Sequence, residues 1–417
     1  MKTKQKRYRL IELVAFFLFL SFSMGSCEKV EWISTTPDTE ETDPDDEEEE
    51  PADRSDNDQT VFMYLPWSTN LLPFFGDNIN DMKTIIGKNI LKNERVVVFL
   101  ASSPTKATLF ELTYKKGKCK EKALKEYNFE TLEYTTAEGI TSILNDVKQY
   151  APAKRYAMTI GCHGYGWIPK SGMSSRSGFR ANKMHWEYEN VPMTRFFGGL
   201  STAYQTDITT LATGISDAGL KMEYILFDDC YMSTVEVAYD LKEVADYLIA
   251  CPTEIMARGM PYEIIGQYLI GDIDYNSICN EFYAFYSTYE EMPCGTIGVT
   301  DCSELDNLAS MMKAINQQYT FDSSLTSSLQ RLDGYSPVIF FDYGDYVSKL
   351  CKDSELLEQF NEQLERTVPF KRNTDYYYSR SSGRVKINTY SGITISDPST
   401  NPDTSSKEET AWYKATH

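Results

Sequence analysis

The stretch Tyr156–Gly164, YAMTIGCHG, is a short apolar run that ends in a histidine between a cysteine and a glycine. A second apolar run, YILF at 224–227, leads in the same way into Asp228-Asp229-Cys230. Continuous apolar runs of this length are typical of strands that are covered on both faces of a parallel sheet. Because reactive groups collect beyond the carboxyl ends of such strands, we expect His163 and Cys230 to lie close together.

A cysteine beside a histidine has the chemistry of a nucleophile with its proton carrier. A thiol is mostly protonated at neutral pH, and a neighbouring imidazole can take or give that proton. The glycine after the histidine lets the backbone approach a substrate closely. We therefore expect His163 and Cys230 to form a catalytic pair, and the backbone N–H groups of Gly164 and Cys230 to hold a developing oxyanion.

Residues 1–27 have the organisation of an export signal. Lysines and arginines precede the apolar stretch Leu10–Phe22, which is short for a membrane-spanning helix. The following Met24-Gly25-Ser26-Cys27 resembles the lipid-attachment box of bacterial lipoproteins. We expect a lipid on Cys27 and a location on the bacterial cell envelope, at the outer membrane or cell surface. The alternative is ordinary secretion with cleavage near Ser26.

Residues 28–59 form an acidic segment that includes the run DDEEEE at 45–50. Such a run repels itself and cannot bury a core, so it predicts an extended tether between the anchor and the folded body. Calcium binding is the weaker alternative, because nothing fixes the geometry of the ligands. The tether carries much of the formal net charge of −20, and the absence of a basic stripe argues against nucleic acid as a partner.

The nine cysteines show no CxxC pair. This argues against a zinc site or a redox motif, and we expect no metal and no cofactor. Most of the remaining cysteines, including Cys162, lie in apolar contexts and are expected to be buried as small hydrophobic residues. Cys294 and Cys302 flank a predicted strand, and a disulfide between them stays open.

Strands alternate with helices along the body of the chain, which predicts an α/β fold with a mainly parallel sheet. Besides the histidine and cysteine strands, we expect strands at 60–65, 95–100, 108–114 and 295–299. We expect helices at 78–91, 136–150, 202–218, 232–247 and 305–319. The division that follows is a catalytic domain at 60–302 and a C-terminal α+β subdomain at 303–417, with two helices and a hairpin near 385–395.

Two motifs resemble those of the clostripain family of cysteine peptidases. His163-Gly164-Tyr165-Gly166-Trp167 is similar to the histidine motif of that family. The run FDDCYM at 227–232, followed by Glu236, Ala238, Tyr239 and Leu241, is similar to its cysteine motif. YSGITI at 390–395 and AWY at 411–413 resemble its closing segments, so the resemblance covers about residues 60–417.

The resemblance implies a caspase-like fold, in which helices sandwich a central sheet, and a peptidase that acts on peptide or protein substrates. It implies that Cys230 is the nucleophile and His163 the proton carrier. It also implies that Asp228 helps to shape a pocket for a basic side chain. The alternative for Asp228 is an aspartate bonded to local backbone at the end of a strand.

The expected preference for Arg or Lys depends on the segment Thr253–Glu263. Family members that cut after arginine usually carry a second acid in a Gly-x-Gly-Trp-Asp-like stretch beyond the cysteine, and this chain departs from that pattern. Arg258 would weaken the attraction for a cationic side chain if it faced the pocket. Glu254 and Glu263 are the candidates for the second acid.

The segment 170–183 between the two motifs is rich in serine, glycine and basic residues, which predicts an exposed loop that is open to proteolysis. Clostripain-like enzymes resemble zymogens that cut themselves in this interval. We therefore expect self-cleavage after Arg176, Arg180 or Lys183. The alternative is a surface loop with no regulatory role.

Three further alternatives remain at this point. His185 competes with His163, but it follows no strand and precedes no glycine, so we expect it on the surface. A surface-binding lipoprotein that keeps the fold without catalysis is one functional alternative. A cysteine transpeptidase, which transfers acyl groups to amines with the same two residues, is the other.

Overall fold

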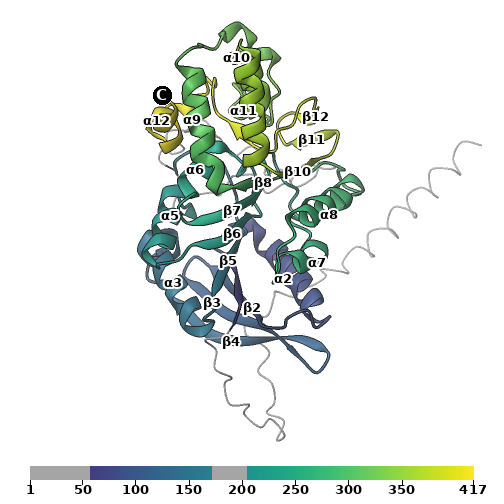
Figure 1. Cartoon of the computed structure of the whole chain (residues 1–417). Coiled ribbons are helices and arrows are strands. Elements are labelled where there is room, and N and C mark those ends of the chain that lie inside the picture. Colours follow the sequence, from purple (N-terminus) through teal and green to yellow (C-terminus); the bar gives the residue numbers. More distant parts are fainter. Residues whose placement is uncertain (1–56, 171–203) are drawn as a thin grey trace, which may run out of the picture. The chain divides into compact units, whose positions relative to one another are not determined.

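The computed structural model describes residues 57–170 and 204–417 (Figure 1). The signal segment with Cys27, the acidic tether up to residue 56, His185 and the candidate cleavage sites at Arg176, Arg180 and Lys183 lie outside these residues. The predicted tether at 28–59 overlaps the fold at its end, because Gln59 begins the first strand. Within the two described ranges, no helix has both the length and the apolar character needed to cross a membrane.

A nine-stranded sheet with the order β10-β8-β7-β6-β5-β1-β2-β3-β4 forms the centre of the fold. Its five middle strands run parallel. They are β2 (Glu94–Ser103), β1 (Gln59–Leu65), β5 (Arg155–Ile160), β6 (Met222–Phe227) and β7 (Ala245–Ala250). Antiparallel strands complete both edges, namely β3 (Lys106–Lys115) and β4 (Lys118–Asn128) on one side and β8 (Thr296–Asp301) and β10 (Phe370–Asn373) on the other. The prediction of a mainly parallel α/β sheet is therefore confirmed.

The register of the middle strands aligns their carboxyl ends. Ile160 at the end of β5 pairs with Phe227 at the end of β6, and with Tyr64 near the end of β1. All seven residues of β1 are buried, as are the last four of β5 and of β6. Burial on both faces fixes these strands in the core, so the turns that follow β1, β5 and β6 meet at one edge of the sheet.

Helices cover both faces of the sheet (Figure 1). One face carries α3 (Ala137–Tyr150), α5 (Ile208–Asp217) and α6 (Val235–Leu241), and the other carries α2 (Leu72–Ile86), α7 (Tyr262–Ile265) and α8 (Tyr275–Ser287). The helix α3 shows how the sequence pattern builds this layer. Thr136 caps its first turn by accepting a hydrogen bond from the N–H of Gly139, and four apolar residues at helical spacing are buried: Ile140, Ile143, Leu144 and Val147.

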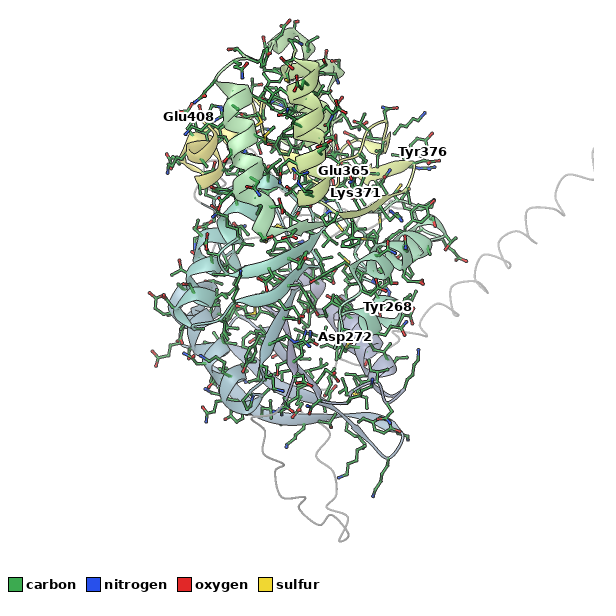
Figure 2. The ribbon with its side chains drawn as sticks, in the orientation of Figure 1. Tyr268, Asp272, Glu365, Lys371, Tyr376 and Glu408 are labelled. Carbon is green, nitrogen blue, oxygen red and sulfur yellow. The ribbon has the colours of Figure 1, made fainter. Side chains whose placement is uncertain are left out.

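The C-terminal segment adds α9 (Leu305–Asn316), α10 (Tyr343–Leu350), α11 (Ser354–Thr367) and α12 (Ala411–Thr416). Two small sheets accompany them, one of β11 (Tyr376–Ser379) with β12 (Gly383–Lys386) and one of β9 (Phe341–Asp342) with β13 (Thr394–Ile395). An ion pair of 2.7 Å joins Glu365 on α11 to Lys371 on β10, and Figure 2 labels both side chains where these elements meet.

Several predicted boundaries are wrong for identifiable reasons. The predicted helix at 232–247 stops at Leu241, because the chain then turns and enters the sheet as β7. The helix predicted at 78–91 begins earlier, at Leu72, since Pro73 is compatible with a first helical turn. In the described part of the helix predicted at 202–218, regular helix starts only at Ile208.

The C-terminal segment also differs from its prediction. The described residues there contain four α-helices, whereas the pattern predicted two. The hairpin is formed by 376–386, and the Thr394–Ile395 strand pairs with β9. Cys294 and Cys302, at opposite ends of β8, carry free thiols.

Candidate active site

The turns after β5 and β6 are bonded directly to each other. The N–H of Asp228 continues the strand pairing by donating to the carbonyl of Ile160 at 2.8 Å. Beyond the strands, Asp229 Oδ1 accepts the N–H of Cys162 at 2.6 Å. A carboxylate from the cysteine turn therefore fixes the backbone of the histidine turn.

Gly164 brings the two turns into contact. A Cβ atom built on this residue would lie 2.3 Å from the carbonyl oxygen of Cys230 and 2.8 Å from Cβ of Asp229. Real side chains do not approach backbone this closely, so only glycine fits here. The residue after the histidine thus lies against the backbone of Cys230, whereas the sequence had predicted a close approach of this glycine to a substrate.

Cys230 lies inside the protein, with none of its surface exposed. Its Sγ accepts the N–H of Ile255 at 3.3 Å and is 3.8 Å from the carbonyl oxygen of the same residue. Burial raises the pKa of this thiol well above its ordinary value, and the negative charge of Glu254 adds to the shift. The thiol is therefore protonated at neutral pH in this conformation.

His163 is only partly buried, and its Nε2 lies 3.0 Å from Oδ1 of Asn70. Asn70 belongs to a short 3₁₀ turn, Thr69–Leu71, between β1 and α2. Asn70 was not predicted as a site residue, because it occurs in a polar turn without a motif. The only available signal was its place shortly after a predicted buried strand.

A cavity of about 100 Å³ borders His163. Cys162 and His163 form part of its wall, together with apolar residues that include Trp67, Ile140, Ile168, Ile208 and Leu211. The prediction that Cys162 is a buried hydrophobic residue is wrong, since its side chain is partly exposed and its Sγ lies 3.4 Å from Oδ2 of Asp229. Cys230 is not among the residues that line this cavity.

Asp228 is buried beneath the cysteine turn, with 1% of its surface exposed. Its Oδ1 accepts the N–H of Met260 at 2.7 Å. This bond ties the end of β6 to the segment Thr253–Glu263, in which the second acid of the pocket was expected. The sequence left open that Asp228 bonds to local backbone and does not shape a pocket. Asp228 does bond to backbone, but its partner, Met260, is distant in sequence.

Glu254 lies next to Cys230 and is also buried, with 3% of its surface exposed. Its Oε1 accepts hydrogen bonds from Tyr231 Oη at 2.8 Å, Ser379 Oγ at 2.7 Å and the N–H of Arg380 at 3.1 Å. These three donors join the cysteine turn to the β11–β12 hairpin. The carboxylate of Glu254 therefore holds two parts of the chain together.

Arg258 pairs with an acid on α2. Its Nη2 lies 2.9 and 2.7 Å from the two carboxylate oxygens of Asp81. Asp77 and Glu263 are farther away, with oxygens 4.0 and 3.9 Å from the guanidinium. The positive charge of Arg258 is thus offset by acids, and Glu263, whose side chain is 46% exposed, lies at the surface beside it.

Aromatic residues of the C-terminal segment pack against both turns. Tyr231, which has a positive φ of 61°, stacks on Phe340 with ring centroids 5.3 Å apart. In the histidine motif, Tyr165 Oη donates to Asp403 at 2.8 Å and Trp167 Nε1 donates to Ser396 Oγ at 2.6 Å. The aromatic residues of this motif therefore anchor the C-terminal segment beside the site.

The described residues contain no group of three or more histidine, cysteine, aspartate or glutamate side chains arranged to hold a metal ion. The nearest acids to the two turns, Asp228, Asp229 and Glu254, each accept hydrogen bonds from the protein instead. The chemistry available at this edge is that of a thiol, an imidazole and backbone N–H groups.

The family model of the clostripain family matches residues 63–383. The chain belongs to the clostripain family. A search of curated proteins gave no match. The predicted family is therefore confirmed by a match that includes both turns of the site.

Solved clostripain-family structures share this fold. A secreted C11 cysteine protease from Bacteroides thetaiotaomicron, iotapain, is 68% identical, with a TM-score of 0.80 over 87% of this chain and 100% of its own. A clostripain from the same species, in complex with the peptide inhibitor BTN-VLTK-AOMK, is 75% identical, with a TM-score of 0.52 over 53% of this chain and 99% of its own. An inactive zymogen C11 protease from Parabacteroides distasonis is 26% identical, with a TM-score of 0.71 over 86% and 98%.

These comparisons establish the class of the protein. The chain is a clostripain-family cysteine protease, and its helix-flanked sheet is the caspase-like fold expected from the sequence. The expectations of family, fold and enzyme class are confirmed. The assignment of individual residues to the reaction is a separate question.

Proposed function

We propose that this protease hydrolyses peptide bonds with Cys230 as the nucleophile and His163 as the proton carrier. The observation that carries the proposal is the contact between the two turns, in which Gly164 lies against the carbonyl of Cys230. It places the backbone of a histidine turn and that of a cysteine turn at one edge of the sheet. The competing His185 lies outside the described residues.

In the proposed reaction, His163 takes the proton of the Cys230 thiol, and the sulfur attacks the carbonyl carbon of the scissile bond. The C–N bond then breaks, and His163 gives the proton to the leaving amine. Water cleaves the thioester, releases the carboxylic acid and restores the thiol. Every proton moves between groups of the chain, the substrate and water, so the reaction requires no cofactor.

The backbone N–H groups of Gly164 and Cys230 are the proposed oxyanion donors. Among the described residues, neither of them donates a hydrogen bond to another backbone group. Two N–H groups aimed at the developing charge are the usual arrangement for acyl transfer. Their position on the two touching turns supports this role.

A peptidyl electrophile tests the dyad directly. We expect it to label Cys230 of the active protein, as located by mass spectrometry of the digested product, and to leave Cys230→Ala unlabelled. The partly exposed Cys162 provides an internal control for non-specific reaction. Labelling at Cys162 alone, with full activity of Cys230→Ala, would refute Cys230 as the nucleophile. No labelling of Cys230 and no peptide hydrolysis by the wild-type protein would favour a protein that keeps the fold without catalysis.

We propose that the uncut chain is a latent form. The support is the complete burial of Cys230 and the raised pKa of its thiol. The relative from Parabacteroides distasonis is described as an inactive zymogen. Cleavage after Arg176, Arg180 or Lys183 would divide the chain between β5 and β6, and the parallel pairing of these strands would hold the two products together.

The latency proposal is tested by incubating purified wild type and Cys230→Ala and sequencing any new N-termini. We expect cleavage after one of the three basic residues in wild type only. Full activity of an intact wild-type chain argues against latency. Equal cleavage of both proteins would instead assign the cut to another protease.

We propose a preference for a basic residue on the amino side of the cut, with Asp228 contributing to the pocket. The inhibitor in the 75% identical structure has the sequence VLTK, which ends in lysine. The pairing of Arg258 with Asp81 removes the objection that its charge repels a cation. Glu254 and Glu263 remain the candidates for a second acid. A cleavage profile over a peptide library tests the preference, which fails if Lys and Arg are not enriched.

We propose that Cys27 carries a lipid that anchors the protease to the bacterial cell envelope. The motif at residues 24–27 supports this, and the relative iotapain is described as secreted. Mass spectrometry of the mature protein should show an acylated Cys27 at its N-terminus. A mature protein that begins at or beyond residue 27 without a lipid would support ordinary secretion instead.

A further inference from the structure

Asn70 reaches His163 from a third strand of the sheet. β1 pairs with β5 in parallel, and the N–H of Gly161 extends this pairing by donating to the carbonyl of Tyr64 at 3.1 Å. The turns after β1 and β5 are therefore neighbours. The short 3₁₀ turn after β1 presents Asn70, and its Oδ1 lies 3.0 Å from Nε2 of His163 across 93 positions of sequence.

This contact determines which nitrogen of the imidazole carries the proton. An amide oxygen only accepts hydrogen bonds, so Nε2 must carry a hydrogen to donate to it. In the neutral imidazole, Nδ1 then holds the lone pair and is the atom that accepts a proton. The same contact also restrains rotation of the ring about its bond to Cβ.

Other polar side chains on the described turns around His163 have partners of their own. On its own turn, Cys162 directs its Sγ toward Asp229. On the turn after β6, Asp229 accepts the N–H of Cys162, and Cys230 is bonded to Ile255. On the turn after β1, Ser68 Oγ donates to the carbonyl of Pro66 within the same loop.

We propose that Asn70 is the positioning residue of His163, which orients the imidazole and fixes Nδ1 as the atom that exchanges the proton with Cys230. This inference rests on the proposed dyad and adds a third side chain to it. Asn70 acts through the histidine and need not touch the substrate.

The test compares purified, active wild type with Asn70→Ala, Asn70→Asp and Ser68→Ala on one peptide substrate. Asn70→Ala should lower kcat about 100-fold, with little change in KM, because orientation of the proton carrier matters in the transition state. Ser68 belongs to the same loop and to the wall of the same cavity, but its hydroxyl bonds to Pro66 and not to His163, so Ser68→Ala should lower kcat far less than Asn70→Ala.

Asn70→Asp provides a readout that a merely structural role would not change. A carboxylate can only accept a hydrogen bond, so it should restore much of the lost kcat. Its negative charge favours the imidazolium, so the limb of the pH profile of kcat/KM that reports His163 should move to higher pH. Melting temperatures of all variants show whether the fold is intact.

Three results are decisive. Wild-type kcat and pH profile in Asn70→Ala would overturn the positioning role while leaving the dyad, which Cys230→Ala tests separately. An equal loss in Asn70→Ala and Asn70→Asp, with lowered melting temperatures and no shift of the pH profile, would assign Asn70 to structure and also overturn the role. Full activity in Cys230→Ala would refute the proposed dyad itself.

Discussion

The two side chains proposed for the reaction lie on touching turns but in different surroundings. Cys230 is completely buried, whereas His163 is partly exposed on the wall of a cavity that Cys230 does not reach. The chemistry of the thiol is thus limited by access and by its raised pKa. In the proposed latent form, we therefore expect the activating change to act on the cysteine side.

The difference arises from what packs on each turn. The cysteine turn is covered by the segment containing Ile255, by the Glu254 carboxylate and by Phe340 of the C-terminal segment. The histidine turn is contacted at its imidazole by the short loop that carries Asn70. The four predictions below test this contrast.

The largest effect is expected for removal of either side chain of the dyad. Cys230→Ala and His163→Ala should each lower the rate of peptide hydrolysis by roughly three orders of magnitude or more, since both take part in the same steps. Circular dichroism should show an intact fold. His185→Ala is the matched control and should keep wild-type activity; a wild-type rate in either dyad variant contradicts the assignment.

The next effect concerns access to the thiol. The rate at which a peptidyl electrophile labels Cys230 should rise about 100-fold when the uncut chain is converted to the cut form, because exposure and a lower pKa both favour the thiolate. A triple variant, Arg176→Ala with Arg180→Ala and Lys183→Ala, should stay slow. Fast labelling of this uncut variant would show that burial of Cys230 does not limit reactivity.

A smaller effect is expected at Glu236, which begins the helix after the cysteine turn. Burial raises the pKa of this carboxyl from 4.5 to about 7. Between these pH values the folded protein holds a proton that the unfolded chain has lost, so the free energy of unfolding should fall as the pH rises. The loss should be about 2 kcal/mol in total, after allowance for relaxation of the site.

Urea unfolding of wild type and Glu236→Gln from pH 4 to pH 8 measures this slope. Glutamine does not ionise, so the variant should lose the share of the pH dependence that belongs to Glu236. Asp240 and Asp333, whose pKa values burial raises to about 6 and about 7, should keep their shares. Glu243→Gln is a suitable control, because Glu243 is exposed and pairs with Lys242 at the surface. An unchanged slope in Glu236→Gln would show that the interior next to the cysteine turn tolerates the charge.

The smallest effect is a difference in stability between variants of two acids in the segment Thr253–Glu263, the buried Glu254 and the exposed Glu263. Glu254→Gln should lower the free energy of unfolding by about 1 kcal/mol. The hydrogen bonds from Tyr231, Ser379 and Arg380 would then end on a neutral amide oxygen in place of a charged carboxylate. It should also lower the pH at which Cys230 is labelled, because one nearby negative charge is gone. Glu263→Gln, at the surface, should change stability by less than about 0.5 kcal/mol.

The contact between the two turns was predictable because it follows from strand ends. Buried apolar runs mark the strands, and parallel pairing brings the residues after them together, as at Ile160 and Phe227. The glycine after His163 could then be interpreted as a point of close backbone approach. The resemblance of both motifs to the clostripain family added the order of the site residues.

Other parts of the site depend on contacts that no local pattern contains. Asn70 and Glu254 owe their positions to partners far along the chain, at His163 and at Ser379. In the sheet, β7 was missed because it follows α6 directly, and the apolar residues of both were assigned to one helix. β4 was missed because it contains few large apolar residues, so no alternation of apolar and polar residues marks it as a strand.

β4 is one of the two edge strands of the sheet, and it carries four lysines: Lys118, Lys120, Lys122 and Lys125. An edge strand presents backbone groups that another chain can pair with, which is a common route to aggregation. β4 also carries Glu121 and Glu126, but its lysines outnumber them, so two copies that paired edge to edge through β4 would bring together strands of net positive charge. The lysines of β4 therefore disfavour growth of the sheet from one molecule into the next through this edge.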